Sequence, residues 1–94
     1  FNRQVGAEEL EAVYARRYAE HRFVRILSAS GSPRLPELSA VTDTNFCDIA
    51  WRLTHGGRSA VIFSAIDNLI KGASGQALQN FNLMHGFDET TGIL

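Results

Sequence analysis

The chain has 94 residues, of which 45% are hydrophobic, so it has room for one small core but not for a dinucleotide-binding domain together with a substrate domain. Its net charge is −1, with acidic and basic side chains interspersed, which excludes a basic face for nucleic acid or an anionic membrane surface. Its apolar runs reach about eight residues, whereas a membrane-spanning helix needs roughly 20. A single cysteine, Cys47, leaves no internal disulfide and favours the cytoplasm.

The first third of the chain predicts a helix, a strand and a loop. Between residues 7 and 20 apolar side chains recur every three or four positions, which is typical of an amphipathic helix. They are Leu10, Val13, Tyr14 and Tyr18. Residues 23–27 are apolar and partly β-branched, and predict a strand. Two prolines and a glycine in residues 28–36 predict a loop, with Leu35 and Leu38 packed onto the core.

The middle of the chain predicts a β-hairpin. In residues 45–53 apolar and polar side chains alternate, which indicates a half-buried strand with Trp51 in the core. The segment His55-Gly56-Gly57 supplies the backbone freedom that a tight reversal needs. The strand that follows, residues 58–66, is apolar on both faces. We therefore expect this second strand to be central in its sheet, or to have one face covered by a partner.

The last third predicts a long helix that follows Asp67-Asn68 and runs to about Met84, ended by His85-Gly86. One stripe of this helix is apolar, and consists of Ile70, Ala73, Ala77, Phe81 and Met84. Its first turns hold the small residues between Gly72 and Gly75, which are poor helix formers. Such residues are tolerated where another backbone or a ligand approaches closely.

Few residues of the chain suggest chemistry of their own. Three histidines lack metal-ligand spacing, so we expect surface or capping roles for them and no metal site; they are His21, His55 and His85. Cys47 lies within a predicted strand, without the turn or helix start that activates a thiolate, and is expected to be structural. The Gly72-x-x-Gly75 pair follows no βαβ pattern and indicates packing, not a dinucleotide fingerprint.

The segment from Ser64 to Leu94 carries a long motif. It contains the run Ile-Asp-Asn-Leu-x-Lys-Gly-Ala-x-Gly-Gln-Ala-x-Gln-Asn-x-Asn-Leu-Met, followed by a glycine and an acidic, threonine-bearing tail. This run resembles the C-terminal signature of the N-acetyl-γ-glutamyl-phosphate reductases, enzymes of the semialdehyde dehydrogenase type. The segment Asn45-Phe-Cys-Asp-Ile49 resembles a strand of the same family, and the earlier part of the chain resembles it more loosely.

The resemblance implies an α+β fold that is one part of a larger, homo-oligomeric enzyme. Residues 1–66 would be the C-terminal part of its catalytic and dimerisation domain. Residues 67–94 would be the closing helix and tail, which return to pack on the NADP-binding domain. The family's catalytic cysteine and histidine motifs do not match any segment here, so the resemblance implies no catalytic residue in this chain and no activity for the chain alone.

The resemblance also implies three cofactor-binding residues: Asn68, Lys71 and Gly72. Asn68 would hydrogen-bond the nicotinamide carboxamide of NADP, because an amide side chain offers both a donor and an acceptor. An alternative is that Asp67 and Asn68 only cap the helix. Lys71 would approach a phosphate or lie solvated, and Gly72 would allow a close approach through its lack of bulk.

The expected function is therefore the NADPH-dependent reduction of N-acetyl-glutamyl 5-phosphate to N-acetyl-glutamate 5-semialdehyde in arginine biosynthesis. A reductase of carrier-protein-linked aminoadipyl or glutamyl phosphate in lysine biosynthesis is an alternative, because such enzymes share this C-terminal pattern. A free-standing interaction domain, whose apolar strand adds to the sheet of a partner, is an alternative of another class.

Overall fold

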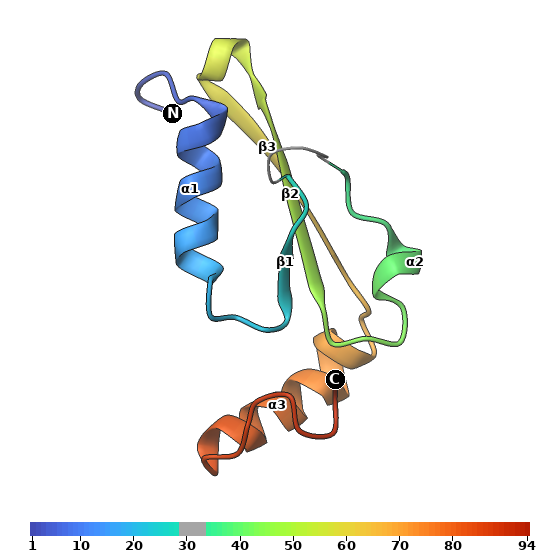
Figure 1. The fold of residues 1–94 in the computed structure, drawn as a ribbon. Helices are drawn as coiled ribbons and strands as arrows, with labels where there is room; N and C mark the ends of the chain where they lie inside the picture. The colour runs from blue at the N-terminus through green and yellow to red at the C-terminus, as the bar shows by residue number, and fades with distance from the viewer. Residues whose placement is uncertain (29–33) are drawn as a thin grey trace.

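A computed structural model describes residues 1–28 and 34–94, and within them the predicted α+β class is confirmed (Figure 1). Most of the predicted loop, residues 29–33, lies outside the described residues. The elements in chain order are α1 (Ala7–Tyr18), β1 (Val24–Ile26), α2 (Leu38–Val41), β2 (Cys47–Thr54), η1 (His55–Gly57), β3 (Ser59–Ile66), η2 (Ile70–Ser74) and α3 (Gly75–Met84).

The three strands form one sheet in the order β1-β2-β3. The predicted hairpin is confirmed, because β2 pairs antiparallel with β3 from Cys47↔Ile66 to Thr54↔Ser59. Its reversal at η1 has positive φ at His55, Gly56 and Gly57. The first strand was predicted from its apolar residues, and it pairs in parallel with the start of β2. The strand predicted between residues 23 and 27 therefore exists, as a shorter β1.

The prediction that the second hairpin strand is central is wrong for this chain, because β3 forms an edge and β2 is the central strand. The side chains of Val61 and Ile62, which point to opposite faces of β3, are 46% and 49% exposed. The apolar composition of β3 was correctly recognised, but the described chain leaves Val61 and Ile62 about half exposed. Cover by a partner, the other expectation, stays a prediction.

Both faces of β2 are covered, so its predicted half-buried character is also wrong. On one face Tyr14 of α1 stacks on Trp51, with ring centroids 4.6 Å apart, which confirms Trp51 as a core residue. On the opposite face Asp48 and Ala50 are almost completely buried. Figure 1 shows the reason, since α1 and α2 lie on opposite sides of the sheet.

The short helix α2 was not predicted. It places Val41 in the core with no exposed surface, whereas Leu35 and Leu38 are 43% and 70% exposed. The prediction that these two leucines pack the loop onto the core is therefore wrong. Proline-flanked, four-residue helices have too few positions to show a helical period, so the sequence gives no hydrophobic pattern that would identify Val41.

The predicted long helix follows Asp67-Asn68 as expected, but its first turn has a different geometry. The turn η2 is π-helical, with i→i−5 hydrogen bonds from Gly72 N to Asp67 O and from Ser74 N to Leu69 O, and α3 follows directly. The helix ends at Met84 as predicted, with Gly86 at φ 73° after it. Within the described ranges, none of the helices combines the length and hydropathy needed to cross a membrane.

Candidate functional site

The candidate site is the turn that leads from β3 into η2, at the end of the sheet where β2 begins. Asp67 Oδ1 accepts hydrogen bonds from the backbone of Leu69 at 2.8 Å and Ile70 at 3.2 Å, which is the geometry of a cap. The next side chain, Asn68, is exposed, and its amide makes no hydrogen bond to the part of the chain that the structure describes. Capping therefore falls to Asp67 alone, and Asn68 remains available to a ligand.

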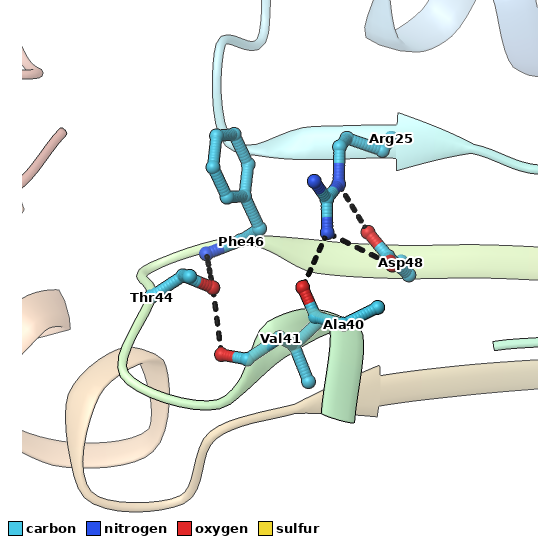
Figure 2. Close-up of polar contacts among 6 residues, drawn as sticks. All are labelled: Arg25, Ala40, Val41, Thr44, Phe46 and Asp48. Carbon is cyan, nitrogen blue, oxygen red and sulfur yellow. Dashed lines mark hydrogen bonds and ion pairs between the residues drawn. The ribbon is translucent and has the colours of Figure 1, made fainter. Parts of the chain in front are cut away.

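The loop before β2 lies against this turn. Asp43 N donates to Asp67 Oδ2 at 2.8 Å, so one carboxylate contacts both segments. Asp43 has φ 62°, a left-handed conformation that aspartate tolerates better than most non-glycine residues. The Thr44 hydroxyl donates to Val41 O at 2.7 Å and accepts from Phe46 N at 3.2 Å (Figure 2). These bonds fix the loop through its own backbone.

An ion pair with a buried carboxylate connects the start of β2 to β1, and its arginine also bonds α2. Arg25 of β1 donates from Nε to Asp48 Oδ1 at 2.5 Å and from Nη2 to Asp48 Oδ2 at 3.0 Å. The same Nη2 donates to Ala40 O of α2 at 3.0 Å, and the guanidinium lies 4.3 Å above the ring of Phe46 (Figure 2). Asp48 is 2% exposed, so the pair is shielded from solvent on the carboxylate side. One arginine thus joins three elements.

The two glycines of the helix start face different surroundings. A Cβ on Gly75 would overlap the Asn45 Oδ1 and lie 2.7 Å from Ile70 O, so this glycine permits the contact between the start of α3 and the loop before β2. A Cβ on Gly72 would meet nothing closer than Ile66 Cδ1 at 3.5 Å, an ordinary contact. The prediction of close packing is therefore confirmed for Gly75, while Gly72 is exposed.

A polar network that sequence reasoning missed lies beneath the turn. Gln79 Oε1 accepts from Lys71 Nζ at 2.7 Å and from Asn45 Nδ2 at 3.0 Å, and Gln79 Nε2 donates to Glu89 at 3.1 Å. Asn45 is 1% exposed, and its Oδ1 has no hydrogen-bond partner among the described residues. The run of amide residues in α3 was a possible signal, but helical periodicity alone does not show which amides point inward.

The same network decides where Lys71 lies. Lys71 is half-buried, with its ammonium group hydrogen-bonded to Gln79 at 2.7 Å and 5.5 Å from the centre of the Phe23 ring. Burial lowers the pKa of Lys71, and the nearby Cys47 and Glu89 act in the opposite direction. Burial also raises the pKa of the Cys47 thiol, which favours the protonated and structural form.

The closing helix exposes its apolar side. Phe81 and Met84 of the predicted stripe are 48% and 81% exposed, and Phe87 in the tail is 55% exposed. Its inward side is polar instead, since the 2%-exposed Asn82 donates to Glu89 O at 3.2 Å and Thr91 O at 3.0 Å. In Figure 1 the helix projects away from the end of the sheet and the tail folds back along it. Its apolar face is therefore free for a neighbouring surface.

The three histidines are exposed, and the described residues contain no group of three or more His, Cys, Asp or Glu side chains suited to a metal ion. His85 contributes to a small aromatic group at the end of α3, with its ring 4.4 Å from that of Phe81. His21 lies edge-on to Tyr18, with ring centroids 5.7 Å apart. The positions of these side chains are thus accounted for by local packing.

Comparison with known proteins identifies the fold and its context. Residues 1–68 match the family described as "Semialdehyde dehydrogenase, dimerisation domain". The N-acetyl-gamma-glutamyl-phosphate reductase of Methanocaldococcus jannaschii is 49% identical over 97% of this chain, and that of Nitrosomonas europaea is 48% identical over 90%. The reductase of Alkaliphilus metalliredigens is 43% identical over 97% of the chain.

These alignments cover 26%, 24% and 25% of the three relatives, so the chain spans about a quarter of their length. The similarity to the reductases extends across both the sheet and the closing helix, since it covers nearly the whole chain. The resemblance that the sequence motifs indicated is therefore confirmed, and the chain belongs to the semialdehyde dehydrogenase dimerisation-domain family.

Proposed function

We propose that this chain is part of an NADP-dependent reductase that converts N-acetyl-glutamyl 5-phosphate to N-acetyl-glutamate 5-semialdehyde and phosphate. The observation that carries the proposal is the 43% to 49% identity to reductases of that name over almost the whole chain. In this enzyme the chain supplies the end of the dimerisation domain and a helix that supports the cofactor, while residues outside it supply the catalytic thiolate and base. The chain alone is then inactive.

Asn68 is the proposed contact to the nicotinamide carboxamide. Support comes from its exposed amide, which has no hydrogen-bond partner among the described residues, and from the hydrogen bonds of its neighbour Asp67, which order the backbone around it. Gly72 lies on the exposed side of the same turn, where its missing side chain leaves room for the cofactor. Lys71 points toward Gln79 in this structure, so a phosphate contact requires its ammonium group to exchange that partner.

The apolar face of α3 is the proposed contact to the NADP-binding domain. Its support is the exposure of Phe81, Met84 and Phe87 on a helix whose inward side is already satisfied by polar contacts. On this proposal residues 1–66 belong to the dimerisation domain and residues 67–94 reach the NADP-binding domain. The exposed edge strand β3 is the surface that a second copy would cover, and the enzyme would act in the cytoplasm.

Replacing Asn68 by alanine in the full-length enzyme tests the cofactor contact. Loss of one amide pair is expected to raise KM for NADPH or lower kcat by roughly tenfold in kcat/KM. Asn80→Ala is a matched control, because Asn80 is an exposed amide of α3 whose Oδ1 accepts from Gln76 at 3.1 Å. Unchanged kinetics in Asn68→Ala would remove the proposed role of Asn68.

A further inference from the structure

The Asp67 carboxylate joins two segments that are 24 residues apart in the sequence. Its Oδ1 accepts from Leu69 N and Ile70 N, both within its own turn. Its Oδ2 accepts from Asp43 N at 2.8 Å, in the loop before β2. These contacts lower the pKa of Asp67, the Asp43 amide being the largest cause and the Leu69 amide the next. We call the bond between Asp43 N and Asp67 Oδ2 the Asp67 link.

The loop that provides the donor is held independently of the turn. The Thr44 hydroxyl bonds both Val41 and Phe46, and α2 is tied to the sheet through Arg25 (Figure 2). The backbone on either side of the left-handed Asp43 is also bonded, since Thr42 N donates to Leu38 O at 3.0 Å and Thr44 N donates to Val41 O at 3.0 Å. The Asp67 link therefore transfers the position of a fixed loop to the turn after β3.

Asn68 lies in the sequence between Asp67 and Leu69, whose backbone N–H donates to the Asp67 carboxylate. Since its own amide makes no hydrogen bond within the described chain, only its backbone sets the direction in which the side chain points. We propose that Asp67 is a positioning residue, which aims Asn68 at the nicotinamide by linking its turn to Asp43. This inference rests on the proposed function, because it assigns a purpose to the direction of Asn68.

Substitution by asparagine separates the link from the cap. Asp67→Asn keeps one carbonyl oxygen to accept from Leu69 and Ile70, but places an NH₂ group against the Asp43 N–H. Asp88→Asn is the matched control, because both contacts of Asp88, from Thr90 N at 2.9 Å and from the Thr90 hydroxyl, are accepted by Oδ1.

The experiment measures steady-state kinetics and amide hydrogen exchange in the full-length enzyme. For Asp67→Asn we expect KM for NADPH to rise roughly three- to tenfold, with KM for the acyl phosphate unchanged. Without cofactor, we expect faster exchange of the Asp43 amide in this variant. Asp88→Asn should keep the wild-type KM values and the wild-type exchange at Asp43.

The outcomes distinguish the inference from the proposed function. If Asn68→Ala raises KM for NADPH while Asp67→Asn leaves it unchanged, the positioning role is overturned and the cofactor contact stands. If Asn68→Ala has no effect, the cofactor contact fails, and the positioning role fails with it. Unchanged exchange at Asp43 in Asp67→Asn would show that the link is absent in solution, whatever the kinetics. A rise in both KM values would indicate a general structural defect and would also contradict the inference.

Discussion

Gly72 and Gly75 lie one turn apart and differ in what surrounds them. An alanine at Gly75 would force apart Asn45 and Ile70, which outweighs the higher helix propensity of alanine. We expect Gly75→Ala to destabilise the protein by about 1–3 kcal/mol in chemical unfolding. Gly72→Ala should leave stability unchanged or slightly raised, since its nearest new contact is 3.5 Å away. Equal destabilisation by both substitutions would contradict this structure of the helix start.

The acid dependence of stability follows from Asp67. Because its folded pKa lies below the ordinary value of 3.8, the carboxylate contributes stability that is fully present above that value. This contribution is lost as the pH falls through the folded pKa. We therefore expect the thermal midpoint of the wild type to fall more steeply than that of Asp67→Asn as the pH is lowered from about 4 to about 2. Parallel curves for the two proteins would show that Asp67 is not hydrogen-bonded as described.

At this scale the sequence predicted some residues and not others. Asn68 was singled out by its place in a motif, and Trp51 by strand alternation, because both signals are local. Asn45 and Gln79 were missed because their contact joins residues 34 positions apart. Whether an amide is buried or exposed depends on how the helix packs against the sheet, and no local sequence pattern predicts that packing.

The elements are held together by contacts between distant segments. Through Arg25, the Arg25–Asp48 pair connects β1, β2 and α2. We expect Asp48→Ala to cost about 1–3 kcal/mol in unfolding free energy, a value reduced from that of a fully buried pair because the Arg25 side chain is 39% exposed. Glu9→Ala, which removes the exposed partner of Arg3, is the control and should cost less than about 1 kcal/mol. If the two losses are equal, Asp48 is not shielded from solvent as described.

Element prediction succeeded where periodicity runs long enough. The first helix and the hairpin were identified because apolar residues recur at a fixed spacing over eight or more positions. The four-residue α2 and the π-helical η2 lack such runs, and the latter replaces the start of a predicted regular helix. π-Helical turns are rare overall, but many of those that occur lie at functional sites. The place of Asn68 two residues before η2 agrees with this tendency.

Among the residues that the structure describes, exposed apolar side chains include those of the edge strand β3 and of the outer face of α3. The sequence indicated both as apolar, but it could not show that the described chain leaves them uncovered. Two such faces are costly for a protein that acts alone, since they promote association. They fit the proposed enzyme, in which a second copy covers one face and the NADP-binding domain the other.

The most direct test of the account is a substrate assay of the full-length protein that contains this chain. The measurement is the rate of NADPH formation from NADP⁺, phosphate and N-acetyl-glutamate 5-semialdehyde, the reverse of the proposed reaction. We predict activity with this semialdehyde, a rise in KM for NADP⁺ in Asn68→Ala, and no activity in the isolated 94-residue chain. Absence of NADPH formation by the full-length protein, or activity only with a carrier-protein-linked semialdehyde, would contradict the account.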